Sequence, residues 1–349
     1  MLNRFFGIWS KDIGIDLGTA NTLVYVRGKG IVINEPSIVA INQKTGKILD
    51  IGSGARRMVG RTPGYITVTR PLVSGVVSDF EVTEQMLKYF VDKVHKGGFT
   101  ILPRPRVVIS VPSGVTEVEK RAVEDATYNA GAREVYLVEE PMAAAIGTRL
   151  PIQDAVPNVI VAVGGGTTEV ALISMNGTIA ARSLRIAGDK LNEDILRYLR
   201  EERNLLIGEA TAENLKILLG SAYPLEEELE GTVRGRDLVS GLPKQISVTS
   251  EEIRDAMQRS VKSIVMAVKN TIEETPPELT ADLINRQIYL AGGGALLKGL
   301  DRLIAHETKL GVKIVDDPLT AVARGCGYIL EHLEELKPIL LSTQQEGYI

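Results

Sequence analysis

The segment NVIVAVGGGTTEVALIS, from Asn158 to Ser174, decides the fold. It reads as an apolar strand, a turn of three glycines, two threonines and a second apolar strand. Consecutive glycines let the backbone come close to another group, and phosphate commonly fills such a turn. The segment DIGIDLGTANTLVYV, from Asp12 to Val26, has the same strand, glycine, threonine and strand. The sequence therefore predicts two related hairpins, each with a turn that suits a phosphate.

The two hairpins differ at the end of their first strand. Asp16 stands there in the first hairpin, and Ala162 stands there in the second. The two positions lie almost half the chain apart, and each hairpin is followed by further strands and helices. We therefore expect an internal structural duplication in which one copy has lost a carboxylate.

The composition indicates a globular protein of two domains. The chain has 349 residues, of which 44% are hydrophobic and 24% charged. Its net charge of -4 argues against a nucleic-acid partner, which would require a basic face. The single cysteine, Cys326, excludes a disulfide framework and favours a reducing cytoplasm. No apolar run approaches the roughly 18 residues that a membrane span needs.

The hydrophobic pattern places secondary structure along both halves. Asp189 is expected to be the N-cap of its helix, and the Pro-containing stretch 150–158 is expected to be the hinge between halves. Strands are predicted over 12–42, 107–111, 134–138, 158–174, 287–294 and 312–315, and helices over 116–130, 139–147, 188–204, 208–223, 250–274 and from about 318.

Three glycine turns are the candidates for ligand chemistry: Gly18-Thr19, Gly164-Gly165-Gly166-Thr167 and Gly292-Gly293-Gly294. Each turn alone is equally consistent with an ordinary tight hairpin. None belongs to a P-loop or to G-x-G-x-x-G. Together they suit a polyphosphate, and Asp16 could hold a hydrated Mg²⁺. The three histidines are widely spaced and form no zinc motif, and no G-x-S-x-G elbow occurs.

Long motifs in a fixed order resemble the MreB family of bacterial actin homologues, within the actin/DnaK-type ATPase superfamily. The motifs are IGIDLGTANTLVYV, VEEPMAAAIG, GGGTTEVALIS, GEATAE, GSAYP and LAGGGALLKGLDRL, and they extend over nearly the whole chain. The resemblance implies an α/β, actin-like ATPase fold of duplicated ribonuclease-H-like domains, with two subdomains in each half around a nucleotide cleft. The implied divisions are an amphipathic segment 1–11, domain I (12–150 and 320–349, with an insertion at about 34–70) and domain II (151–319, with an insertion at about 189–250).

The same resemblance implies a site for ATP or ADP with Mg²⁺. It makes Asp16 the ligand of the Mg²⁺ ion, through water, and Glu140 the group that orients or activates the attacking water. A first-turn helix acid explains Glu140 equally well. The implied nucleotide contacts are Thr19, Ala20, Asn21, Gly164, Gly165, Gly166, Thr167, Glu213, Asn214, Leu215, Lys216, Gly293, Gly294, Ala295 and Leu296.

Two departures from the family pattern bear on this chemistry. Ala162 replaces an expected Asp, and Asn192 stands where relatives often have Asp. A methyl group neither ligates a metal nor accepts a hydrogen bond, and losing an electrostatic group at a charged transition state costs on the order of 10²–10³ in rate. We therefore expect ATP binding with slow hydrolysis. The sequence does not distinguish a natural variant from an engineered substitution at Ala162. It also leaves two outcomes for assembly open, namely filaments that persist because ATP is retained and filaments that fail to form.

The resemblance also implies polar filaments that pair, bind the inner face of the cytoplasmic membrane and organise wall synthesis with membrane proteins of the wall-elongation machinery. It places Val118 in the contact between paired filaments, although an ordinary solvated helix has the same pattern. The candidate membrane residues are Leu2, Phe5, Phe6 and Trp9, with Arg4 and Lys11 nearby, and Ile101 and Leu102 in a later loop. A frayed terminus or an apolar clip onto the protein itself is the alternative for residues 1–9.

Two other functions use the same nucleotide fold. A small-molecule kinase would need a substrate pocket with a catalytic acid, for which the sequence shows no constellation beyond the nucleotide motifs. A chaperone of the DnaK type would need a peptide-binding domain, which the sequence does not show. A filament-forming ATPase is the favoured interpretation.

Overall fold

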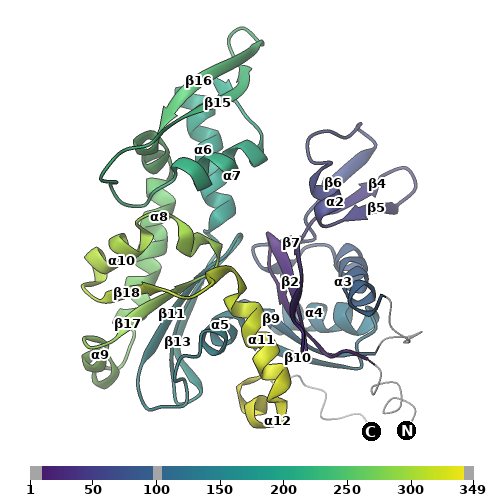
Figure 1. Ribbon diagram of the computed structural model, residues 1–349, viewed down its shortest axis with the longest axis vertical. Coiled ribbons are helices and arrows are strands. Elements are labelled where there is room, and N and C mark those ends of the chain that lie inside the picture. The colour runs from purple at the N-terminus through teal and green to yellow at the C-terminus, as the bar shows by residue number, and fades with distance from the viewer. Residues whose placement is uncertain (1–9, 97–103, 342–349) are drawn as a thin grey trace. The chain divides into compact units, whose positions relative to one another are not determined.

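Two compact units make up the part of the chain that the computed structural model describes, residues 10–96 and 104–341. The first unit holds the described residues within 1–155, 173–178 and 319–349, and the second holds 156–172 and 179–318. Figure 1 shows the helices and strands of each unit. Among the described residues, no helix is both long and apolar enough to cross a bilayer.

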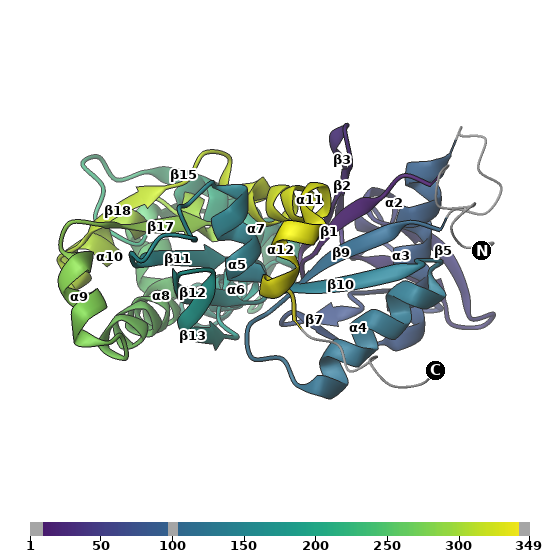
Figure 2. The same ribbon diagram turned by 90° about the horizontal axis from the view of Figure 1, so that it is seen from below.

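A five-stranded sheet forms the centre of the first unit, in the order β10-β9-β1-β2-β3. Its strands are β1 (Ile13–Leu17), β2 (Asn21–Val26), β3 (Gly30–Pro36), β9 (Arg106–Val111) and β10 (Glu134–Glu139). Strands β1, β2 and β3 form an antiparallel meander, whereas β1, β9 and β10 run parallel and lie side by side in Figure 2. The strands predicted over 12–42 are thus confirmed in this sheet as far as Pro36.

The two faces of this sheet pack against different helices because alternate strand residues point to opposite sides. Ile13 and Ile15 join a core with α3 (Phe80–His95) and α4 (Glu117–Asn129). Gly14, between them, faces α11 (Ala321–Glu331), where an added Cβ would lie 2.9 Å from the backbone of Cys326. Asp16 continues the Gly14 side of β1, so it lies on the α11 side of the sheet.

Small residues bring α5 (Glu140–Gly147) close to α11. A Cβ at Gly147 would lie 1.9 Å from the carbonyl oxygen of Ala321, and one at Gly325 would lie 1.8 Å from that of Ala143. The two backbones therefore touch without side chains between them, and only glycine fits at these two positions. The last turns of the chain follow as α12 (Leu333–Leu336) and η3 (Lys337–Ile339).

A small sheet in the order β5-β4-β6 accounts for residues 39–69 of the first unit. Its elements are β4 (Val39–Asn42), β5 (Lys47–Ile51), α2 (Ser53–Arg56) and β6 (Ile66–Thr69), followed by the two-residue strands β7 (Leu72–Val73) and β8 (Val76–Val77). Antiparallel pairing on both sides makes β4 the central strand of this sheet.

The second unit repeats the sheet of the first, in the order β13-β12-β11-β17-β18. Its strands are β11 (Asn158–Val163), β12 (Thr168–Ser174), β13 (Gly177–Leu184), β17 (Gln287–Ala291) and β18 (Gly311–Ile314). Strand β11 runs parallel to β17, and β17 to β18, as β1, β9 and β10 do in the first unit. This correspondence confirms the duplication that the two hairpins predict.

Helices and a second small sheet complete this unit. The helical elements are α6 (Gly188–Glu202), α7 (Glu209–Leu219), α8 (Ser250–Glu273), α9 (Pro277–Leu283), η1 (Gly293–Leu296), α10 (Leu300–Thr308) and η2 (Pro318–Thr320). The small sheet contains β14 (Leu205–Leu206), β15 (Glu230–Asp237) and β16 (Pro243–Thr249), and Figure 1 shows β15 and β16 as a long hairpin.

The predicted N-cap of α6 is wrong. The N-cap residue is Ala187, and Asp189 lies in the first turn. The backbone amides of Gly188 and Asp189 donate to the carbonyl oxygens of Gly164 and Gly165, at 3.2 and 2.8 Å. Because these two amides already have acceptors, the helix begins without a side-chain cap.

Candidate functional site

The turn between β1 and β2 is held in place from outside the hairpin. The hydroxyl of Ser37 donates to the carbonyl oxygen of Gly18 at 2.6 Å, and the amide of Ser37 donates to Ala20 at 3.0 Å. The hydroxyl oxygen of Thr19 accepts a hydrogen bond from the Gly75 amide at 2.8 Å. A Cβ at Gly18 would lie 2.7 Å from the carbonyl oxygen of Asn21. This turn is therefore a rigid support in which glycine is required.

Asp16 lies at the end of β1 in a poorly hydrated setting. Burial raises its pKa to about 7, although a 3.4 Å hydrogen bond from the Ser110 hydroxyl opposes the shift. The pKa of the buried Cys326 thiol is also raised, first by burial and then by the charges of Asp16 and Glu140. Glu140 is the first residue of α5. The structure thus brings the two predicted catalytic carboxylates to the same side of the first unit.

A hydrated Mg²⁺ ion fits the surroundings of Asp16. A carboxylate with one weak donor and a raised pKa is stabilised by a nearby cation. No group of three or more metal-ligating side chains occurs in residues 10–96 and 104–341. Mg²⁺ usually keeps several waters and takes one or two carboxylates, so a single carboxylate beside a phosphate turn suits it.

The turn between β11 and β12 is held by α6. The Gly164 amide donates to the carbonyl oxygen of Thr167 at 2.8 Å, which closes the turn. The carbonyl groups of Gly164 and Gly165 point to the first amides of α6, as described above. The turn thus lies beside the N-terminus of a 15-residue helix, where the helix dipole favours an anion.

Ala162 lies at the position in β11 that Asp16 has in β1. It is buried, with 5% of its surface exposed, and it pairs in register with Ala291 of β17. The second unit therefore lacks both the carboxylate and the neighbouring hydroxyl that Ser110 supplies in the first. Asn192, on α6, is also buried, and its side-chain oxygen has no hydrogen-bond partner among the described residues.

The predicted contacts on α7 differ in their surroundings. The Lys216 ammonium donates to the carbonyl oxygen of Gly188 at 2.9 Å, so this cation lies at the start of α6. Leu215 is buried in the hydrophobic core, Asn214 is exposed and Glu213 is half-buried. The Lys216 side chain is therefore linked to the second turn, because it bonds to Gly188, whose amide bonds to Gly164.

The third glycine turn packs directly on the second. Gly292 has a φ of 79°, and a Cβ there would lie 2.4 Å from the carbonyl oxygen of Val163. A Cβ at Gly294 would lie 2.2 Å from the Val163 side chain. Ala295 is buried, whereas Leu296 is 55% exposed. The second unit thus brings together α6, α7 and both of its glycine turns.

Some of the residues that support the turns could not be predicted from the sequence. Ser37 and Gly75 fix the first turn, and Gly188 links Lys216 to the second. None of them belongs to a recognisable motif, because each acts through contacts that are distant in the sequence. The candidate membrane residues Leu2, Phe5, Phe6, Trp9, Ile101 and Leu102 lie outside the described residues. Val118, the predicted pairing residue, is 79% exposed on α4.

Comparisons with known proteins agree with this geometry. The family model "MreB/Mbl protein" matches residues 10–338. The cell shape-determining protein MreB of Escherichia coli K12 is 50% identical over 338 residues, which cover 96% of this chain and 97% of that protein. Mbl of Bacillus subtilis 168 is 48% identical over 335 residues, with 96% and 100% coverage.

Solved structures give the same result. MreB5 of Spiroplasma citri bound to ADP superposes with a TM-score of 0.89 at 37% identity, covering 94% of this chain and 98% of that one. The MamK double helical filament superposes with a TM-score of 0.78 at 22% identity, covering 92% and 99%, which supports the fold alone. The chain has the actin-like fold and belongs to the MreB/Mbl family.

Proposed function

We propose that the chain binds ATP with Mg²⁺, assembles into filaments through this binding, and acts in maintaining rod cell shape. The observation that carries the proposal is the pair of supported turns, Gly18–Ala20 and Gly164–Thr167, at matching strand ends of a duplicated sheet. The similar MreB5 of Spiroplasma citri has been solved with ADP and with AMPPNP. The E. coli and B. subtilis relatives are cell shape-determining proteins.

Several of the predicted residues have distinct parts in this proposal. Backbone amides of both turns bind the phosphates, and the Lys216 ammonium adds positive charge beside the second turn. Residues 293–296 contact the adenosine. When bound, Mg²⁺ neutralises phosphate charge, and Asp16 holds it through water. Glu140 orients the attacking water. Ala162 contributes no charge, so we expect slow hydrolysis from a chain that still binds the nucleotide.

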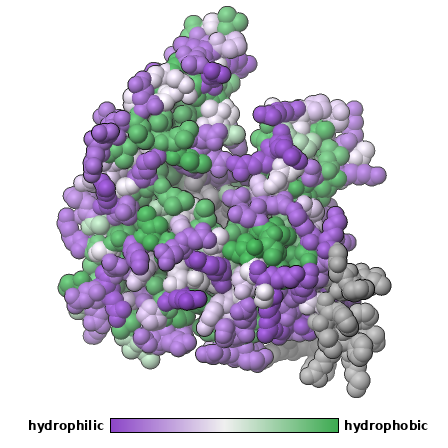
Figure 3. Space-filling view, in the orientation of Figure 1, coloured by the Kyte–Doolittle hydropathy of each residue, from purple (hydrophilic) through white to green (hydrophobic). Residues whose placement is uncertain are grey.

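Assembly and membrane binding complete the proposal. On the face shown in Figure 3, hydrophobic residues form separate patches among hydrophilic ones, so hydropathy does not single out one assembly surface. We assign pairing of filaments to Val118 because it is highly exposed on a regular helix. We assign attachment to the inner face of the cytoplasmic membrane to residues 1–9 and 101–102, and expect the filaments to act there with membrane proteins of the wall-elongation machinery.

Electron microscopy of the full chain with ATP, Mg²⁺ and lipid vesicles tests this function. We expect ordered paired filaments on the vesicles, and none when nucleotide is removed. Nucleotide binding is measured separately by calorimetry, so that a failure to bind is distinguished from a failure to assemble. A chain that binds ATP but stays monomeric under all conditions would contradict the filament function and favour a kinase.

Flotation with vesicles tests the membrane residues. A chain lacking residues 1–9 and carrying polar residues at positions 101 and 102 should no longer float with the lipid. Undiminished flotation of this variant would exclude both segments as the membrane anchor.

A further inference from the structure

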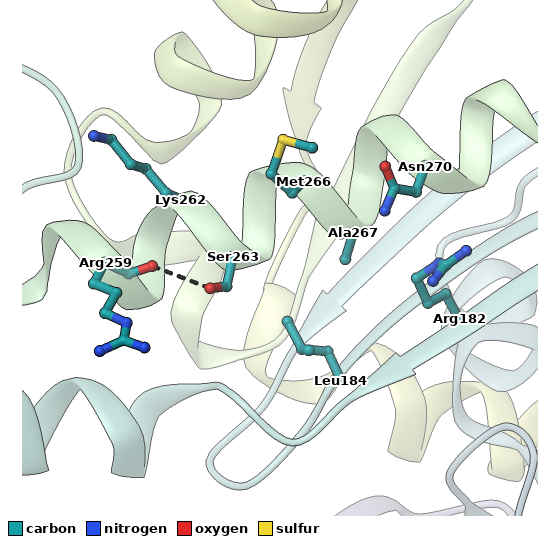
Figure 4. Close-up of a pocket in the computed structure, with 8 residues that line it drawn as sticks. All are labelled: Arg182, Leu184, Arg259, Lys262, Ser263, Met266, Ala267 and Asn270. Carbon is teal, nitrogen blue, oxygen red and sulfur yellow. Dashed lines mark hydrogen bonds between the residues drawn. The ribbon is translucent and has the colours of Figure 1, made fainter.

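A hollow of ≈ 430 Å³ lies between β13 and α8 in the second unit, away from the glycine turns (Figure 4). Strand β13 contributes Arg182 and Leu184, which share one face of the strand. Helix α8 contributes a stripe of residues that recur three or four positions apart from Arg259 to Asn270. Asn270 is eleven positions after Arg259, which is a rise of about 16 Å, so the hollow is an elongated groove along α8.

The middle of the groove is apolar. Figure 4 shows Leu184 and Ala267 pointing toward one another from β13 and α8. Leu184 packs against the core of the unit, Ala267 is buried, and Met266 beside it is 49% exposed. An apolar side chain placed here would cover surface that is otherwise in water.

Positive charge surrounds this apolar centre. Within residues 10–96 and 104–341, Arg259 and Lys262 form no ion pair, and both are exposed. Arg182, at the other end of the groove, is paired with Glu274, but its Nε has no hydrogen-bond partner among the described residues and is buried. The groove therefore has two cations without a counter-charge and one donor without an acceptor.

Strand β13 is the edge strand of its sheet, with β12 as its neighbour. An edge strand presents unpaired backbone donors and acceptors, which an extended peptide can pair with. Alternate side chains of such a peptide would point toward α8, about 7 Å apart. Arg182 lies near the end of α8 at Glu274, and Leu184, the last residue of β13, lies nearer the middle of α8. A peptide that continues past Leu184 therefore runs toward Arg259.

We propose that this groove binds an extended, acidic peptide segment of a partner protein, which adds to β13 as a further strand. One apolar side chain of the peptide packs on Leu184, Met266 and Ala267. A carboxylate of the peptide, two residues away, lies between Arg259 and Lys262. Charge complementarity selects the acid, the apolar floor selects its neighbour, and the strand edge supplies backbone hydrogen bonds. The glycine turns take no part, so this binding is separate from that of nucleotide.

The probe is a dye-labelled peptide in which Leu and two Glu residues occupy alternate positions between Thr residues. We expect the full chain to bind it with a Kd below a millimolar, weakening as salt is raised. The double variant R259E/K262E should bind at least tenfold more weakly, and M266S severalfold more weakly. The variant K313E changes an exposed lysine on β18, the other edge strand of the same sheet, and should bind like the wild type.

Three further measurements separate this occupant from others. A peptide with N-methyl groups on its pairing edge should lose binding, and bound peptide should slow hydrogen exchange of β13 amides. Absence of peptide binding, equal binding by R259E/K262E, or equal binding of the N-methyl peptide overturns the proposal. Anionic vesicles that bind through Arg259 and Lys262 while the peptide does not would instead identify a lipid surface as the occupant. Circular dichroism melting confirms that each variant is folded.

Discussion

Ala162 pairs with Ala291 between β11 and β17, at the place where Asp16 and Ser110 meet between β1 and β9. The two sheets have the same strand order, so the comparison is position for position. One copy keeps a carboxylate and a hydroxyl, and the other has two methyl groups. The duplicated fold is therefore preserved while the chemistry of its halves has diverged.

Restoring the carboxylate should accelerate hydrolysis. We expect Ala162→Asp to raise the rate of phosphate release from ATP on the order of 10²-fold, because a charged group near the reacting phosphate and its metal stabilises the transition state. Single-turnover phosphate release with Mg²⁺ measures this. Ala162→Ser, which adds a polar group without charge, is the control and should change the rate much less. A wild-type rate in A162D would contradict the assignment of this position.

Lys216 should contribute to ATP affinity. Its ammonium lies at the start of α6 beside the second turn, so Lys216→Met should weaken ATP binding roughly 10- to 100-fold, as expected for a lost charged hydrogen bond. Calorimetry gives the Kd. Lys269→Met removes a half-exposed lysine that pairs with Glu307 on the surface, and should leave the Kd unchanged. Equal affinities of K216M and wild type would remove Lys216 from the site.

The contact between α5 and α11 should tolerate no added methyl group. Gly325→Ala places a Cβ against the Ala143 carbonyl and should lower the free energy of unfolding by about 3 kcal/mol or more, because neither backbone can withdraw. Urea unfolding measures the loss. Gly64→Ala, in the same unit, meets no atom of the described residues within 4 Å and should cost nothing or slightly stabilise the chain. Similar stabilities of the two variants would show that the helices can separate.

His95 should make stability depend on pH. Burial lowers its pKa, with the Lys11 charge adding to the effect and Asp92 opposing it. Its Nε2 accepts from the Lys11 amide at 3.1 Å, and Nδ1 lies 2.8 Å from the Val91 carbonyl oxygen, so the ring is neutral when folded. Because the unfolded chain binds the proton more readily, stability is complete above the unfolded pKa of about 6.5 and falls as the pH drops below it.

The measurement is the melting temperature between pH 8 and pH 5. His95→Gln should reduce the pH dependence of the free energy of unfolding. The reduction is at most the uptake of one proton, which is about 1.4 kcal/mol per pH unit. His332→Gln changes an exposed histidine and should leave the slope as it is. Identical slopes for H95Q and wild type would refute the role of His95.

Val118 should matter for pairing of filaments and not for folding. An acid is favourable in the first turn of α4, so Val118→Glu should fold normally but give single filaments in electron micrographs. Ile284→Glu changes a similarly exposed residue, at the end of α9, and should leave pairs intact. Pairs formed by V118E, or lost in both variants, would exclude a specific role for Val118.

Much of the fold could be predicted because its signals are local. Apolar runs on both sides of a glycine turn predicted the hairpins, and the helices predicted over 116–130 and 250–274 agree with α4 and α8. The N-cap of α6 could not be predicted, because its first amides bond to Gly164 and Gly165 on another element. A local rule assigns the cap to Asp189, and a contact between elements overrides it.

The candidate site was predictable to the extent that its motifs are contiguous. The two turns and Lys216 could be found by resemblance, and the loss of a carboxylate at Ala162 followed from comparing the hairpins. That Leu215 belongs to the core required the packing of α7, and the roles of Ser37 and Gly75 required contacts from other parts of the chain. The groove beside β13 has no motif, since a strand edge and a helix stripe form it only after folding.

The close contact of α11 with β1 and α5 sets an order of events during synthesis. The second unit ends at residue 318, before α11 emerges, whereas the first unit lacks a covering for Gly14 until residues 321–331 have left the ribosome. Translation usually lets the N-terminal domain fold first. Here the half that is made first completes the α11 side of its sheet only after the second half has been made.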